Sequence, residues 1–140
     1  MTNRTQRIPP DELRMPGELE RKMLWLASWT IHYANHLRES TDGLKVGGHQ
    51  ASSASLATIM TALYFHALRP QDRVAVKPHA SPNYHAIQYL LGRQTQEKLE
   101  NFRGYKGAPS YPSRTELSRN FFLPSAISFY CVESQGNRAM

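Results

Sequence analysis

The sequence contains a single cysteine, Cys131, among its 140 residues. One thiol excludes an internal disulfide and a cysteine-rich metal site, and it fits a reducing compartment. The first residues lack the apolar core of a secretory signal. The uncharged stretch over 46–68 is interrupted by His49, Gln50 and several serines, so it is not expected to cross a membrane. We therefore expect a cytoplasmic protein with no membrane partner.

The sequence also lacks any run of five or more like charges. Basic residues outnumber acidic residues by 17 to 11, for a formal net charge of +6. Such a balance can indicate nucleic acid or an anionic ligand. The basic residues are scattered, however, and form no stripe with aromatic residues. A solvated surface is the better interpretation, and we expect no nucleic-acid partner.

Hydrophobic periodicity predicts one mostly helical domain with few strands. Helices are expected over about 16–38, 53–68, 81–91 and 95–102, and strands over 73–77 and 126–132. This order is typical of an α/β architecture, but a doubly wound parallel sheet needs more strands. We expect an incomplete α/β domain over 16–114, a loose N-terminal arm over 1–15 and a divergent tail over 115–140.

The helix expected over 16–38 is apolar around most of its circumference, with a polar strip near Arg21, Ser28 and Asn35. Such a helix is normally enclosed by partners, and few elements are present to enclose it. An exposed apolar face and self-association are therefore expected. His32 and His36 have a spacing that can hold a metal, but no acidic third ligand lies nearby, so a packing role is favoured.

Two histidines lie where a loop meets a helix. Gly47 and Gly48 precede His49, and glycines let the backbone approach a ligand while an imidazole exchanges protons near neutral pH. His79 lies between a predicted strand and the helix that begins near Ser81, a position where α/β folds place ligands. Each histidine could be an ordinary hydrogen-bonded loop residue. Two histidines in the same topological position indicate a ligand site more strongly than either histidine alone.

Four runs then match a known family in order and spacing: GGHQASSASLATIMTALYFHALRP, KPHASPNYHAIQYLLGR, TQEKLENFR and APSYPSR. They resemble the N-terminal domain of transketolase-like thiamine-diphosphate enzymes, and in particular the homodimeric decarboxylating component of pyruvate dehydrogenase. The match spans about 25–114. The resemblance implies an incomplete thiamine-diphosphate-binding domain of the α/β class.

The resemblance also implies roles for individual residues. His49 and His79 correspond to catalytic histidines that face the thiazolium ring and the substrate. Ser52 and Tyr111 correspond to cofactor-binding positions in the same cavity. Attack on a substrate carbonyl places charge on its oxygen, and histidines can supply the proton or hydrogen bonds that this charge needs. Lys77 stands where the family commonly has a neutral polar residue, which bears on substrate choice.

One family motif is missing. Family members anchor the cofactor diphosphate through Mg²⁺ held by Gly-Asp-Gly and a later asparagine, and no Gly-Asp-Gly occurs in this chain. We therefore expect a truncated piece of an enzyme of 2-oxo acid decarboxylation and acyl transfer, or of ketol transfer. Alone it is expected to bind neither thiamine diphosphate nor Mg²⁺ and to be inactive.

The resemblance implies a 2-oxo acid or a ketose as substrate, and a second copy or a complementing subunit as partner. Two alternatives stay open. The chain could be a partner subunit of a split transketolase-like enzyme, or a non-catalytic interaction module that keeps the ancestral fold.

Overall fold

The computed structural model describes residues 14–40, 43–69, 72, 74–112 and 127–128. This part of the chain is mostly helical, and its strands are β1 (Val74–Ala75) and β2 (Ile127–Ser128), which pair in parallel. The expectation of a mostly helical chain with few strands is thus confirmed. Most of the predicted arm and tail lies outside the described residues, so the domain boundaries stay predictions.

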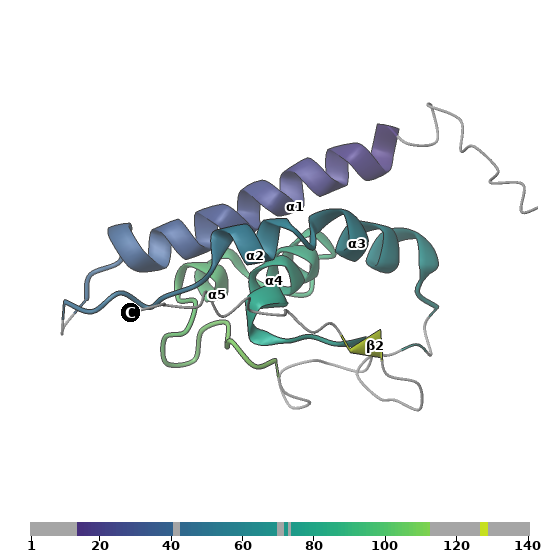
Figure 1. Cartoon of the computed structure of the whole chain (residues 1–140). Coiled ribbons are helices and arrows are strands. Elements are labelled where there is room, and N and C mark those ends of the chain that lie inside the picture. The colour runs from purple at the N-terminus through teal and green to yellow at the C-terminus, as the bar shows by residue number, and fades with distance from the viewer. Residues whose placement is uncertain (1–13, 41–42, 70–71, 73, 113–126, 129–140) are drawn as a thin grey trace, which may run out of the picture.

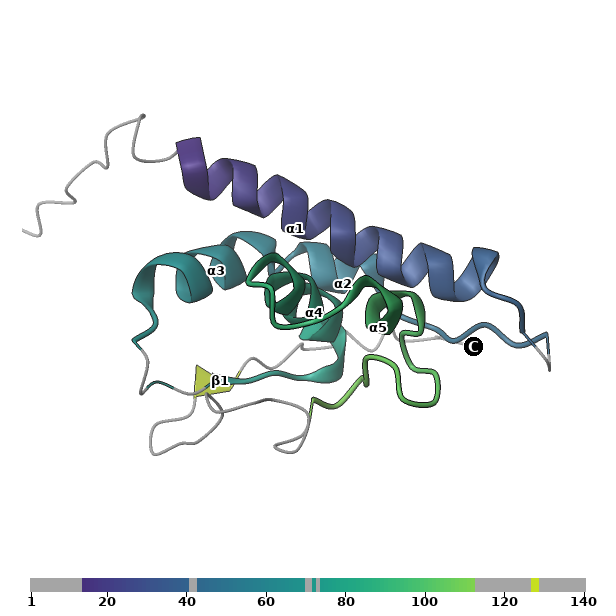
Figure 2. The ribbon, with the colours of Figure 1, turned by 180° about the vertical axis from the view of Figure 1, so that it is seen from behind.

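The described part of the chain contains helical elements of three kinds: α, π and 3-10. In chain order they are α1 (Arg14–His32), the π-helix η1 (Tyr33–Leu37), α2 (Gln50–Ala54), α3 (Ala57–Ala62), the π-helix η2 (Leu63–Ala67), the 3-10 helix η3 (Pro78–Ala80), α4 (Ser81–Leu90) and α5 (Gln96–Glu100). The long helix α1 lies across α2, α3 and α4 as an outer layer (Figure 1). Seen from behind, α4 lies between α3 and α5 (Figure 2). None of the described helices is long and apolar enough to cross a membrane.

The main core lies between α1, α3 and α4. Its buried members are Met23, Ala27, Ala57, Met60, Tyr84, Ala86 and Ile87. The helix α4 is buried from Ser81 to Gln88, so its polar side chains need partners inside the protein.

A buried polar pair meets that need between α2 and α4. The Ser53 hydroxyl donates to Asn83 Oδ1 at 3.0 Å, and Asn83 Nδ2 donates to the Ser53 carbonyl oxygen at 2.6 Å. Both side chains are almost wholly inaccessible to solvent. The pair ties the start of α4 to the helix that follows the glycine loop.

Several predicted boundaries are wrong in detail. The first helix begins at Arg14, so its first turn holds no acidic residue. The helix expected over 53–68 begins at Gln50 and is interrupted after Ala54. The Ser53 side chain lies within α2 and does not cap it, since its hydroxyl donates to Asn83 Oδ1.

The third and fourth predicted helices agree more closely with the structure. A 3-10 turn precedes α4, so Ser81 is not a cap; its hydroxyl donates to the Pro78 carbonyl oxygen at 2.8 Å. The helix ends at Leu90, and Gly92 follows with a φ of +68°, as expected for a glycine that ends a helix. Thr95 caps α5.

Candidate active site

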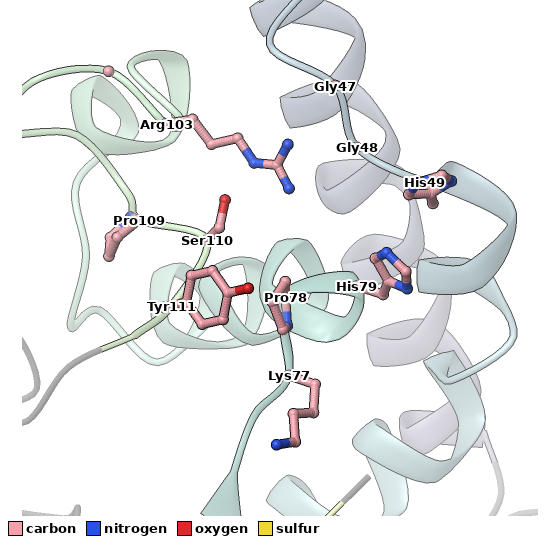
Figure 3. A pocket seen from close by; sticks show the side chains of 11 residues that line it. Gly47, Gly48, His49, Lys77, Pro78, His79, Arg103, Pro109, Ser110 and Tyr111 are labelled. Atoms are coloured by element: carbon pink, nitrogen blue, oxygen red, sulfur yellow. The ribbon is translucent and has the colours of Figure 1, made fainter. Parts of the chain in front are cut away.

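A cavity of about 970 Å³ opens between the glycine loop before α2, the turn from β1 into η3, and the loop after α5 (Figure 3). Three of the four predicted site residues, His49, His79 and Tyr111, line it. Ser52 does not, and its carbonyl oxygen accepts a hydrogen bond from Ser55. The lining is Gly47, Gly48, His49, Lys77, Pro78, His79, Arg103, Gly104, Pro109, Ser110 and Tyr111.

The two imidazoles lie against each other at one side of this cavity (Figure 3). Their ring centroids are 4.6 Å apart and their planes meet at 62°. His49, at the start of α2, is exposed, and His79, in η3, is half-buried. The two rings that the resemblance assigns to one cavity thus do lie together at its edge. Their catalytic role stays a prediction.

The glycine loop needs glycine for its conformation and for its closeness to α1. Gly47 and Gly48 have φ angles of +80° and +116°, which side chains strongly disfavour. A Cβ on Gly48 would meet Ile31 Cγ2 at 3.1 Å. The loop therefore lies tightly on α1, and His49 follows directly from it.

Asn35 holds the loop from the side of α1. Its Nδ2 donates to the Gly47 carbonyl oxygen at 3.0 Å, and the Gly47 N–H donates back to Asn35 Oδ1 at 2.9 Å. The same Nδ2 donates to the Ile31 carbonyl oxygen at 2.8 Å. Asn35 belongs to the π-helix η1, and such wide turns are frequent at functional sites.

Arg103 holds the loop from the opposite side. Its Nη1 donates to the Val46 carbonyl oxygen at 2.7 Å, and the guanidinium carbon lies 5.3 Å from the centroid of the Phe102 ring. Arg103 itself has a φ of +59°, and its backbone N–H donates to the Ala108 carbonyl oxygen at 2.8 Å. A strained residue that supports a site in this way is typical of functional loops.

Sequence reasoning did not identify Asn35 or Arg103 as site residues. The signal for Asn35 is an amide in the narrow polar strip of an otherwise apolar helix. Arg103 has no comparable signal, because its partner Val46 lies 57 residues away in the sequence.

The charge of the cavity decides what it can hold. Lys77 and Arg103 are cations, two further lining residues are imidazoles, and none of the lining residues that the structure describes is a carboxylate. Mg²⁺ prefers carboxylate and amide oxygens. No three histidine, cysteine, aspartate or glutamate side chains gather anywhere in the described residues. The described lining therefore suits a ligand with an anionic group or a carbonyl oxygen, and it does not fit a metal-bound diphosphate.

The rings of His32 and His36 stack at 4.9 Å between centroids, and both side chains are exposed. Their packing role stays a prediction.

Comparison with known proteins gives one consistent set of relatives. The chain is 37% identical over 124 residues to the pyruvate dehydrogenase E1 component of Escherichia coli K12, which covers 80% of this chain and 14% of the relative. The Cupriavidus necator and Pseudomonas aeruginosa E1 components are 36% and 38% identical, each with 13% of its length covered.

No family model matches the chain, and no solved structure matches it. The matched region nevertheless includes most of this chain, and the relatives share one name. The chain is therefore homologous to a limited segment, about 14% of the length, of pyruvate dehydrogenase E1 components.

Proposed function

We propose that this chain forms the histidine wall of a thiamine-diphosphate-dependent active site that decarboxylates a 2-oxo acid and transfers the acyl group, with ketol transfer as the alternative reaction. One observation carries the proposal. The rings of His49, at the start of α2, and His79, in η3, lie 4.6 Å apart between their centroids, at the edge of one cavity. The homology to E1 components supports the choice of cofactor and reaction class.

The cavity residues suit the oxygen of a substrate carbonyl. Thiamine diphosphate, when bound, supplies carbanion stabilisation at the carbonyl carbon. His49 and His79 would donate a proton or hydrogen bonds to the carbonyl oxygen as charge develops on it. Tyr111 lines the cavity and is proposed to contact the cofactor. For Ser52 the same proposal rests on the resemblance alone, because its side chain does not line the cavity.

The metal and diphosphate end must come from outside the cavity lining described above, since that lining holds no carboxylate. We propose that the chain acts as one part of a larger site, completed by further polypeptide or by a complementing subunit. Whether further polypeptide or a separate subunit completes the site, this chain would contribute the two imidazoles.

A graft tests this function. Residues 25–112 replace the homologous segment of the Escherichia coli E1 component, and pyruvate-dependent turnover is measured. We expect an active chimera in which His49→Ala or His79→Ala lowers kcat/KM by about 100-fold or more, as for loss of a general acid or base. The control His66→Ala, in η2 and outside the cavity, should stay within about twofold of the unsubstituted chimera.

Two outcomes would refute the proposal. An active chimera indifferent to His49→Ala and His79→Ala would remove the catalytic role of the pair. A folded chimera with no turnover at all would favour a non-catalytic interaction module.

A further inference from the structure

We propose that the cavity binds a small oxyanion, a carboxylate or a phosphate, on the guanidinium of Arg103, across the cavity from the histidine pair. The inference rests on the proposed function only in naming this anion as the acidic group of the substrate. Arg103 would then orient the substrate through its acidic group, with the carbonyl directed toward the histidine pair.

The composition of the lining favours an anion. Among the described residues, every ionisable side chain that lines the cavity is cationic, an imidazole or a phenol, namely Lys77, Arg103, His49, His79 and Tyr111. The described lining thus holds two full positive charges and no carboxylate side chain. A cavity lined by one sign of charge concentrates ligands of the opposite sign.

The hydrogen bonds of Arg103 leave one end of the guanidinium for a ligand. Nη1 is engaged by the Val46 carbonyl oxygen, and Nε is buried without a partner among the described residues. No described residue accepts a hydrogen bond from Nη2. The side chain reaches from its loop toward the glycine loop, and the Ser110 hydroxyl points into the same space (Figure 3).

The guanidinium is also held in place before any ligand arrives. The contact with Val46 and the Phe102 ring beneath it restrict the side chain, so less rotamer freedom is lost on binding. Guanidinium groups match carboxylate and phosphate geometry through paired N–H donors. Arg103 is therefore better suited than a mobile surface arginine to orient an oxyanion.

Two substrate classes share this chemistry. A 2-oxo acid carries its carboxylate next to the reactive carbonyl, and a ketose phosphate carries its phosphate several bonds away. Both present an oxyanion and a carbonyl, so the cavity chemistry admits both. The relative affinities of the cavity for a carboxylate and for phosphate distinguish the two substrate classes.

Histidine NMR on the whole chain provides the test. Pyruvate, inorganic phosphate and neutral acetone are titrated separately at constant pH and ionic strength, and the imidazole Cε1–H signals are followed. We expect saturable shifts of His49 and His79 with pyruvate or phosphate but not with acetone. Histidines outside the cavity serve as internal references: His32, His36, His66 and His85.

Arg103→Gln should weaken anion binding about tenfold or more, as for the loss of one charged hydrogen bond. The matched control is Arg93→Gln, an exposed arginine outside the cavity, which should bind as the unsubstituted chain does. Arg103→Lys keeps the charge and should recover part of the affinity. His85 reports on the fold of these variants, because its Nε2 lies 2.7 Å from the Pro109 carbonyl oxygen in the loop that carries Arg103.

Each result bears directly on the proposal. Tighter binding of pyruvate supports it with a 2-oxo acid as ligand, and tighter binding of phosphate supports it with a phosphorylated ketose. Equal affinity of Arg103→Gln with an undisturbed His85 signal, equal shifts of all six histidines, or equal binding of acetone would overturn it. An overturned anion site would leave the graft experiment, and so the proposed function, standing on its own.

Discussion

Gly48 shows how much of the site depends on single residues. Gly48→Ala places a side chain at a φ of +116° and against Ile31, so both backbone strain and a close contact oppose it. We expect a loss of about 1–3 kcal/mol in the free energy of unfolding. Urea unfolding followed by circular dichroism measures this loss.

The control for that substitution lies in α1. Gly17→Ala meets no atom within 4 Å, and alanine favours a helix over glycine by about 0.5–1 kcal/mol. It should be neutral or stabilising. Equal effects of the two substitutions would show that the glycine loop is not held against α1.

The buried pair of Ser53 and Asn83 gives a second prediction at this scale. Ser53→Ala leaves Asn83 Oδ1 without its donor inside the protein, which should cost about 1–3 kcal/mol. Ser55→Ala removes an exposed hydroxyl that donates to the Ser52 carbonyl oxygen and should cost about 0.5 kcal/mol or less. Thermal unfolding of the two variants compares these costs, and a Ser53→Ala protein as stable as Ser55→Ala would contradict the buried contact.

At the scale of elements, η2 and α4 meet through two tyrosines. The rings of Tyr64 and Tyr84 lie 6.1 Å apart. Burial raises the pKa of both hydroxyls well above the ordinary value of 10.0, and the neighbouring Tyr64 raises the pKa of Tyr84 further, while Arg93 opposes the shift. Both hydroxyls therefore stay neutral in the folded protein at pH values where the unfolded chain begins to lose these protons.

Stability should depend on alkaline pH accordingly. Because the folded pKa values are raised, this contribution is fully present below about pH 10 and is lost as the pH rises further. We expect the urea midpoint to fall above pH 10, and Tyr84→Phe to flatten that fall. Tyr105→Phe, at an 86% exposed position, should leave the slope unchanged. An identical pH slope in Tyr84→Phe and the original chain would contradict the burial of this hydroxyl.

Local signals predict the ends of elements well only where no distant contact competes. The helix expected over 81–91 ends within a residue of α4, and the helix expected over 95–102 begins within a residue of α5, because Gly92 and Thr95 mark these ends through contacts with neighbouring residues. The start of α2 was misplaced because Ser53, a good cap by type, is drawn into a contact with Asn83 thirty residues away. The π-turn η1 has no simple residue pattern and was read as ordinary helix.

The site residues show the same difference between local signals and distant contacts. His49 and His79 stand out because each follows a recognisable local motif, and the structure brings them together. Arg103 and Asn35 act through backbone groups of a loop far away in the sequence, and pairings of that kind are set by the tertiary fold. Residues that hold the loop are therefore beyond sequence reasoning, while the two histidines that line the cavity are within it.

At the scale of the whole molecule, we expect no saturable binding of thiamine diphosphate below about millimolar concentration, which corresponds to roughly −4 kcal/mol. Single hydrogen bonds contribute about 1 kcal/mol each, and immobilising a ligand costs about 4 kcal/mol or more. The lining residues that the structure describes include no carboxylate, so they hold no Mg²⁺ bridge that would add to this sum. Calorimetric titration with Mg²⁺ present decides the matter, and micromolar affinity would reveal a diphosphate site elsewhere in the chain.

The outer face of α1 should drive association. Trp25 is 63% exposed, and its ring stacks on Trp29. We expect concentration-dependent oligomers in light scattering, weakened about tenfold by Trp25→Gln because less apolar area is buried between copies. Lys22→Gln, an exposed neighbour on α1, is the control and should leave the size distribution unchanged. A monodisperse monomer across the concentration range would show that this face stays solvated.

The placement of the tryptophans also decides which binding events the intrinsic fluorescence of this protein can detect. The chain has two, Trp25 and Trp29, and both lie on α1, with their ring planes 12° apart. Neither lines the cavity. Tryptophan emission and its quenching by acrylamide should therefore change when something binds to the outside of α1. A ligand that fills the cavity should leave the same emission spectrum unchanged. A fluorescence change on mixing with another protein would mark contact at α1, and binding at the histidines needs a probe of their own.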